Sequence, residues 1–164
     1  MSSYRIHVEK DYTVFCAAHF VTYDGHKCED LHGHNYRVAV GLDGGLDENF
    51  YVFNVVPLKR ALREIVNRLD HKMLVAQNSP LLNVEVDDDS VVVTYAAKRK
   101  RYVFPRAGVV LLPIPNTTAE MLATWIVGQL RQTLSAHDTR TIRSVEIEVE
   151  ESAGQRAIYR EEWN

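Results

Sequence analysis

Four side chains able to bind a metal or act as a base are concentrated within ten residues of this sequence. The stretch 25–34, GHKCEDLHGH, contains His26, Cys28, His32 and His34, whereas the whole 164-residue chain has seven histidines and two cysteines. Imidazole nitrogen and thiolate sulfur are ligands that zinc prefers, and a thiol with a lowered pKa can also act as a base. The stretch is therefore compatible with a structural zinc site, with a catalytic metal site beside a reactive thiol, or with a loop that is only rich in histidine.

The spacing of His32 and His34 places both imidazoles on one side of a predicted strand. Residues 35–42, NYRVAVGL, carry large apolar side chains at alternate positions, and the two histidines continue that row. His19 lies near the end of the preceding predicted strand and reaches the other two if these strands are neighbours. Three neutral imidazoles suit Zn²⁺ and leave a fourth tetrahedral position for water or substrate. Cys28 could fill that position instead, so a site of three histidines and a site closed by the thiol both remain open.

The elements that must position these residues follow an α+β plan. Apolar periodicity predicts one helix at 58–70, with Asn54 as a plausible cap, and a second helix from 117, where Thr117 and Glu120 fit a capping box. Further strands are expected at 4–20, 142–151 and 156–160, with short strands inside 83–112. The order β-β-α-(β insert)-α-β-β predicts an antiparallel sheet with both helices on one face.

Composition limits the class of protein and its partners. A chain of 164 residues with 46% hydrophobic residues suits one domain, residues 1–164, with its own core. The net charge of −3 gives no indication of a nucleic-acid surface, and no apolar run approaches the ~18 residues of a membrane helix. The first residues lack the pattern of a signal peptide, so we expect a cytoplasmic protein whose Cys16 and Cys28 are reduced.

Five motifs occur in one order and together resemble those of a known enzyme family. They are F-x-A-A-H at Phe15–His19, C-x-x-x-H-G-H at Cys28–His34, L-D-H-K-x-L at Leu69–Leu74, T-T-A-E at Thr117–Glu120 and V-x-E-S at Val149–Ser152. Outside an insertion at about 78–112, the chain resembles the 6-pyruvoyltetrahydropterin synthase / 6-carboxytetrahydropterin synthase family. The resemblance implies the tunnelling fold, a four-stranded antiparallel sheet with two helices on one face. It also implies trimers that close a barrel and pair into homo-hexamers.

The resemblance assigns the metal ligands and a free catalytic thiol. Zinc is expected on three histidines, His19, His32 and His34. Cys28 is expected to be the general base, and its pKa of about 8.5 in water must be lowered by the nearby Zn²⁺ or by an imidazolium. Asp70 and His71 are implied to relay protons with Cys28. Because adjacent side chains do not face each other on a helix, this requires the chain to leave the helix there, or Asp70 to contact another group. The alternative is that His71 compensates the helix dipole.

Glu151 is expected to anchor a pterin. It ends the inward-facing apolar row of the predicted strand 142–151, where a buried carboxylate needs a donor. A pterin offers a ring N–H and an amino group in bidentate geometry, and the resemblance assigns Glu151 this role, with an internal Arg or Lys as the alternative partner. Thr117 and Thr118 are expected to serve the helix start first and to contact the pterin second. The KRKR run at 98–101 is expected to be a solvated turn, with triphosphate binding as the weaker option.

The spacing inside C-x-x-x-H-G-H favours one branch of the family. Three residues separate the Cys from H-G-H, as in bacterial carboxy-forming members of the queuosine pathway. We therefore expect a zinc-dependent enzyme that converts 7,8-dihydroneopterin triphosphate to 6-carboxy-5,6,7,8-tetrahydropterin, acetaldehyde and triphosphate. The alternatives are a 6-pyruvoyltetrahydropterin synthase, a paralogue that acts on another pterin, for example by side-chain cleavage of dihydroneopterin, and a non-catalytic zinc- or pterin-binding oligomer. Two departures from the family pattern are Asn54, where the family has Asp, and the insertion at 78–112.

Overall fold

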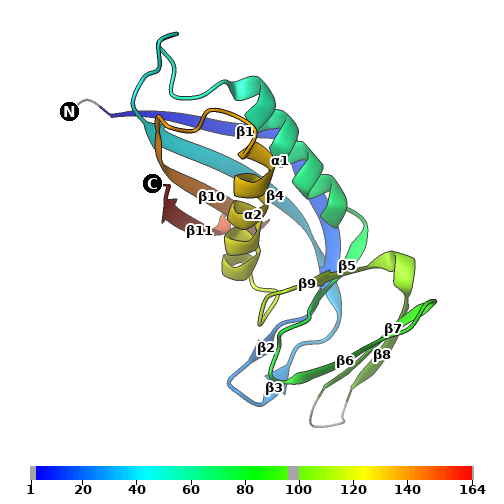
Figure 1. Cartoon of the computed structure of the whole chain (residues 1–164). Helices are drawn as coiled ribbons and strands as arrows, with labels where there is room; N and C mark the ends of the chain where they lie inside the picture. Colours follow the sequence, from blue (N-terminus) through cyan, green and yellow to red (C-terminus); the bar gives the residue numbers. More distant parts are fainter. Residues whose placement is uncertain (1–2, 96–99, 164) are drawn as a thin grey trace.

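An antiparallel sheet of four long strands forms the centre of the structure (Figure 1). The computed structural model describes residues 3–95 and 100–163. Tyr36, Val38 and Val149, on the two central strands, are completely buried, as expected for strands with one face in the core. The predicted α+β architecture, with its four antiparallel strands, is confirmed. These strands are adjacent in the order β11 (Gln155–Glu162), β10 (Ile142–Ser152), β4 (His32–Gly44) and β1 (Tyr4–His19).

Two more strands extend this sheet beyond β1. β5 (Lys72–Ala76) pairs in parallel with the end of β1, and β9 (Val109–Leu112) pairs in parallel with β5. The sheet therefore has six strands and is mixed, which the prediction of four antiparallel strands did not include. The sequence MLVA of β5 is buried throughout, a pattern typical of a strand covered on both faces. The last strand of the predicted 78–112 insertion thus belongs to the main sheet.

The rest of the insertion forms its own three-stranded antiparallel sheet. It is made of β6 (Leu82–Val86), β7 (Ser90–Tyr95) and β8 (Arg101–Pro105), followed by the short 3-10 helix η1 (Arg106–Gly108). The short strands predicted inside 83–112 include β7 and β8, and residues 96–99 of that stretch lie outside the described residues. The buried side of this sheet packs against Phe20, Met73 and Val75 in a second apolar cluster.

The same end of the molecule holds a short hairpin that carries the cysteine of interest (Figure 1). β2 (Thr22–Tyr23) pairs with β3 (Lys27–Cys28). Cys28 is partly buried and packs on the second apolar cluster. The insertion therefore lies against the loop between the two long strands of the predicted metal site.

Two helices lie side by side on one face of the sheet (Figure 1). α1 (Val55–Leu69) begins three residues earlier than predicted. The Asn54 side chain accepts the N–H of Val56 at 2.9 Å, so the expected cap is confirmed. The apolar stripe of α1 is buried in the main core together with that of α2 (Ala119–Leu134).

The start of α2 differs from the prediction by one residue. Thr118, not Thr117, is the N-cap, and its side chain accepts the N–H of Met121. The capping box of Thr117 and Glu120 was therefore wrong. Thr117 is instead 1% exposed, and its hydroxyl donates to the carbonyl oxygen of Phe20 at 3.0 Å. Thr117 joins the start of α2 to the end of β1.

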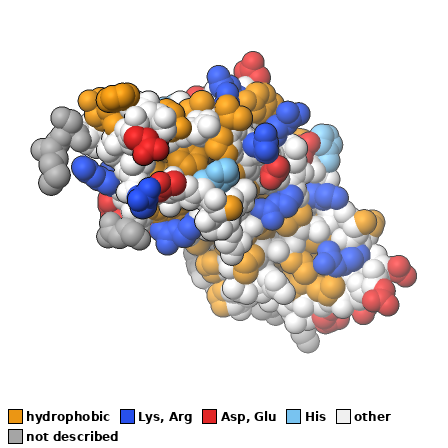
Figure 2. Space-filling view, turned by 45° about the horizontal axis from the view of Figure 1, so that its top comes forward, with side chains coloured by type: hydrophobic (Ala, Val, Ile, Leu, Met, Phe, Trp, Pro, Cys, Tyr) orange, Lys and Arg blue, Asp and Glu red, His pale blue; other side chains and the backbone are white. Residues whose placement is uncertain are grey.

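The surface mixes both signs of charge with apolar side chains. Figure 2 shows Lys and Arg side chains interspersed with Asp and Glu side chains on the face drawn, with apolar side chains between them. Phe50 is the most exposed of the large apolar side chains described, at 83%. Within the described part of the chain, neither helix is long and apolar enough to cross a membrane.

Candidate active site

Three imidazoles meet where β1 ends and β4 begins. His19 and His32 are direct partners in the antiparallel pairing of these strands, and His34 lies two residues further along β4. One ring nitrogen from each residue lies within 4.8 Å of those of the other two. The structure thus brings together the three histidines that the sequence placed on neighbouring strands. Cys28 is not a member of this cluster, so the geometry does not favour a fourth ligand from its sulfur.

Hydrogen bonds set the orientation of two of these imidazoles. His19 Nδ1 donates to the carbonyl oxygen of Thr117 at 2.9 Å, and His32 Nδ1 donates to that of Asp30 at 2.8 Å. Because a carbonyl oxygen only accepts, each ring in its neutral form has its proton on Nδ1 and its lone pair on Nε2. Burial lowers the pKa of His19, which favours the neutral ring. This donor set fits a divalent transition metal.

Glu151 lies against the imidazoles, not against a basic residue. Its Oε1 is 3.3 Å from Nε2 of His19 and 3.6 Å from Nε2 of His34. A neutral Nε2 and a carboxylate oxygen are both acceptors, so their close approach suits a site that attracts a cation or a proton. Within the described ranges, 3–95 and 100–163, no Arg or Lys side chain forms an ion pair with Glu151, so the alternative of an internal basic partner is not supported.

Tyr36 is a site residue that the sequence analysis missed. Its side chain is completely buried, its hydroxyl lies 3.2 Å from both ring nitrogens of His19, and it donates to Oε1 of Glu151 at 3.5 Å. Burial and the charge of Glu151 raise the pKa of Tyr36, so the phenol remains protonated and acts as a donor. The signal was available, because Tyr36 continues the alternate-position row of His32 and His34.

A pocket of about 240 Å³ opens beside Glu151. Thr118, Glu29 and Arg156 also line it. Of the two threonines expected to contact a substrate, Thr118 lines this pocket. The buried Thr117 hydroxyl donates to the Phe20 carbonyl oxygen, and the Thr117 carbonyl oxygen accepts the Nδ1–H of His19.

The Cys28 thiol lies next to a backbone carbonyl oxygen and near one positive charge. Its Sγ donates to the carbonyl oxygen of Glu29 at 3.5 Å. Burial raises the pKa of the Cys28 thiol, and the positive charge of Lys100 opposes this effect. In the single chain, the cation that lowers the pKa of this thiol is therefore a lysine of the insertion.

Asp70 and His71 form a pair because the helix ends in front of them. α1 stops at Leu69, Asp70 has an extended backbone, and His71 has φ +55°, which turns its Nδ1 to within 2.9 Å of Asp70 Oδ2. Both residues are fastened to β1, since Asp70 Oδ1 accepts the N–H of Cys16 at 2.8 Å and the N–H of His71 donates to the Cys16 carbonyl at 2.7 Å. The N–H of Cys16 lowers the pKa of Asp70, so this carboxylate is ionised. The imidazole of His71 is 82% exposed, and the pair contacts Cys16, not Cys28.

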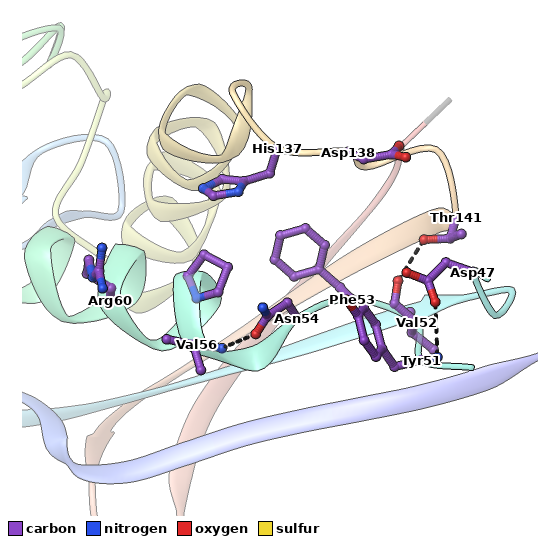
Figure 3. Close-up of a pocket in the computed structure, with 11 residues that line it drawn as sticks. Asp47, Tyr51, Val52, Phe53, Asn54, Val56, Arg60, His137, Asp138 and Thr141 are labelled. Carbon is purple, nitrogen blue, oxygen red and sulfur yellow. Dashed lines mark hydrogen bonds between the residues drawn. The ribbon is translucent and has the colours of Figure 1, made fainter. Parts of the chain in front are cut away.

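A second pocket, of about 390 Å³, lies at the opposite end of the sheet (Figure 3). Asn54 and Arg60 of the α1 region face His137 and Thr141 across it. Thr141 is beside Gly45, whereas the imidazoles are at the start of β4. The 13 residues of β4 separate the two ends by roughly 40 Å at about 3.3 Å per residue. This pocket is therefore distinct from the candidate active site.

Comparison with known proteins agrees with this geometry. The family model described as 6-pyruvoyl tetrahydropterin synthase matches residues 7–162. A Methanocaldococcus jannaschii protein, provisionally named as a 6-carboxy-5,6,7,8-tetrahydropterin synthase, is 35% identical over 148 residues, which cover 89% of this chain and 88% of that protein. The 6-carboxy-5,6,7,8-tetrahydropterin synthase of Aquifex aeolicus is 32% identical over 139 residues, covering 83% and 77% of the two chains.

Solved structures extend the similarity over nearly the whole chain. The crystal structure of 6-pyruvoyl tetrahydropterin synthase from Plasmodium vivax has a TM-score of 0.91 and 30% identity, and the match covers 99% of this chain and 100% of that one. A variant of the same protein, in which a glutamate described as catalytic is replaced by alanine, has a TM-score of 0.90, 29% identity and the same coverage. The chain belongs to the 6-pyruvoyl tetrahydropterin synthase family, and it has the tunnelling fold that the motifs predicted. It is therefore an enzyme of the pterin synthase type.

Proposed function

We propose that this protein is a zinc-dependent 6-carboxy-5,6,7,8-tetrahydropterin synthase that acts on 7,8-dihydroneopterin triphosphate. The observation that carries the proposal is the meeting of three imidazoles with Glu151 beside a pocket. The names of the Methanocaldococcus and Aquifex relatives support the carboxy-forming reaction over the pyruvoyl-forming one. A cytoplasmic enzyme that supplies the queuosine pathway follows from the same proposal.

His19, His32 and His34 would hold the zinc. Two of these rings have Nε2 free for a ligand bond because carbonyl oxygens occupy their Nδ1–H groups. When bound, Zn²⁺ supplies a Lewis acid that polarises an oxygen of the substrate side chain. The protein contributes the fixed orientation of the rings and the neutral state of buried His19.

Glu151 binds the heterocycle in this proposal. A pterin ring N–H and its exocyclic amino group are two parallel donors that a carboxylate accepts together. Tyr36 donates to Oε1 of Glu151 and so restricts its rotation, and Thr118 lies on the same pocket. The carboxylate also lies next to two of the imidazoles, so a ring held by Glu151 has its side chain close to the metal ligands.

Cys28 is proposed to remove a proton from the substrate side chain. Burial raises the pKa of its thiol in the single chain, so the proposal requires this pKa to be lowered when zinc, substrate or a neighbouring subunit completes the site. Asp70 and His71 are proposed to exchange protons with this thiol. Since His71 is exposed and the pair contacts Cys16, we propose that the pair of one subunit serves the Cys28 of another.

The free edges of the sheet support assembly into a homo-oligomer. Among the described residues, β11 is an edge strand, and β1 pairs with β5 only at Ala17 and Ala18, so the first half of β1 has no partner strand on that side. Pairing of such edges between subunits would close the sheet into a barrel. We propose the trimer, and the hexamer of two trimers, that the resemblance implies.

One specific observation favours a second candidate function. Glu29 lines the pocket together with Glu151, and its Oε2 lies 3.8 Å from Nε2 of His32, whereas Cys28 packs on the apolar cluster. The Plasmodium vivax protein has a catalytic glutamate. If Glu29 is the base, the enzyme acts on a different pterin or cleaves the side chain differently.

The products distinguish the two functions. Zinc-loaded protein would be incubated with 7,8-dihydroneopterin triphosphate, and the products analysed by mass spectrometry, for the native chain and for Cys28→Ala and Glu29→Gln. The proposal predicts 6-carboxytetrahydropterin, acetaldehyde and triphosphate, lost with Cys28→Ala. A different pterin product that is lost with Glu29→Gln but persists with Cys28→Ala establishes the second function, and binding without turnover contradicts both.

A further inference from the structure

The ammonium group of Lys100 donates three hydrogen bonds to the loop that carries Cys28. Its Nζ donates to the carbonyl oxygens of Cys28 and Glu29 at 2.9 and 2.8 Å and to Asp30 Oδ1 at 2.6 Å. A lysine ammonium has three N–H donors, so these contacts occupy all of them. Lys100 is 70 residues from Asp30 in the sequence, so the contact joins the insertion to the loop in front of H-G-H.

The position of Lys100 is itself fixed. Its carbonyl oxygen accepts the N–H of Tyr95 at 3.0 Å, which ties the residue to the end of β7, and β8 follows immediately at Arg101. Lys100 is thus held by the insertion's own sheet, which packs on the second apolar cluster together with Cys28. Figure 1 shows this sheet at the same end of the molecule as β3.

The loop that Lys100 binds contains both candidate bases and leads into the imidazole cluster. Cys28 and Glu29, the two candidate bases, are the residues whose carbonyl oxygens Lys100 binds. The next residue, Asp30, uses its own carbonyl oxygen to accept the Nδ1–H of His32. One side chain therefore binds the backbone of both candidate bases and the side chain of the residue that orients an imidazole.

The two carbonyl contacts are the important part of this arrangement. Asp30 is 97% exposed, and ion pairs with such exposed carboxylates are weak tethers. The carbonyl oxygens of Cys28 and Glu29 are part-buried, and a buried acceptor that loses its donor is costly, so they hold Lys100 more strongly. The charge of Lys100 also lowers the pKa of the Cys28 thiol, which burial raises.

We propose that Lys100 is a positioning residue of the reaction, through which the insertion holds residues 28–30 and places the candidate bases relative to His32. This inference rests on the proposed function, because it assumes that Cys28 or Glu29 reacts. The inference assigns the insertion a role in the site. It also argues against triphosphate binding by Lys100, because the three N–H donors of Lys100 are already occupied.

The test compares Lys100→Met with Arg101→Met, a matched control that removes an exposed charge from the next residue. Steady-state kinetics of the zinc-loaded protein with 7,8-dihydroneopterin triphosphate give kcat and KM, and hydrogen exchange measures the backbone amides of residues 28–32. Because misplacing a reacting group by about 1 Å costs up to ~10²-fold in rate, Lys100→Met is expected to lower kcat by roughly 10- to 100-fold. KM should remain within about threefold, and exchange should accelerate in 28–32 only.

Several results would overturn the inference. A rise in KM at unchanged kcat would show that Lys100 binds substrate. An equal loss of kcat in Arg101→Met would show that the effect comes from removing any positive charge in this region. Unchanged kinetics and exchange would remove the role altogether. If Lys100→Met does not fold, Lys100→Arg replaces it as the test variant. Arginine keeps the charge but cannot direct three N–H groups at the same acceptors, so this variant should fold with reduced kcat. A native kcat in Lys100→Arg also contradicts the inference. Failure of the proposed function is separable, since an inactive native protein still reports, through exchange, whether Lys100 holds the loop.

Discussion

Replacing Glu151 with Gln tests the assignment of the pterin anchor. The amide has the size of the carboxylate and keeps an oxygen able to accept from Tyr36, so the local packing is preserved. What changes is the charge, and one of the two acceptors becomes a donor that faces the donors of the pterin. Hydrogen bonds to charged groups contribute about 1–1.5 kcal/mol more than neutral ones, so two of them give about 2–3 kcal/mol. This corresponds to a loss of roughly 30- to 150-fold in kcat/KM.

The assay is steady-state turnover of zinc-loaded Glu151→Gln, with metal content measured in parallel. Glu146→Gln is the matched control, because Glu146 lies on the same strand but pairs with Arg5, which does not line the pocket. The control should keep native kcat/KM, and both variants should keep their metal. A native kcat/KM in Glu151→Gln would refute pterin anchoring by this carboxylate, and loss of metal would show instead that Glu151 helps to bind the ion.

Three further outcomes follow from the geometry. Cys28→Ala should abolish turnover while metal content stays native, measured by metal analysis and product formation; loss of the metal would make the sulfur a ligand. Asn54→Ala should lower the free energy of unfolding by about 1 kcal/mol, measured by urea denaturation, because α1 loses the acceptor for the Val56 N–H; unchanged stability would argue against the cap. The pKa of Asp70 is lowered in the folded protein by the Cys16 N–H, so its stabilising contribution is present above the unfolded pKa of about 3.9 and is lost as pH falls through the folded pKa. Asp70→Asn should therefore flatten the loss of stability below about pH 4, and an unaltered pH profile would contradict this.

The parts of the site that the sequence predicted are those governed by local periodicity. The spacing of His32 and His34 fixes which face of β4 they share, and the pairing of β4 with β1 then brings in His19. The separation of Asp70 and His71 from the helix was required by their adjacency, and the positive φ of His71 provides it. These predictions depend on one pair of neighbouring strands and on one helix end.

The parts that were missed depend on contacts between distant segments. Two consecutive threonines both suit an N-cap. Thr118 serves as the cap, whereas the Thr117 hydroxyl donates to the distant Phe20 carbonyl oxygen, a contact that the local sequence does not indicate. The parallel pairing of β5 and β9 leaves no alternation that distinguishes them from other buried strands. Lys100 was expected to lie in a solvated turn, because nothing near KRKR in the sequence indicates the loop that it binds. Lys98 and Arg99 of that run lie outside the described residues.

The central claim is that the three imidazoles bind the metal and the thiol does not. Titration of the metal-free protein with Co²⁺, followed by absorption spectroscopy, tests it most directly, because a thiolate ligand adds an intense sulfur-to-metal charge-transfer band. We predict d–d bands without that band, unchanged in Cys28→Ala and lost in His32→Ala. A charge-transfer band that disappears in Cys28→Ala, or undiminished binding in His32→Ala, would contradict the account.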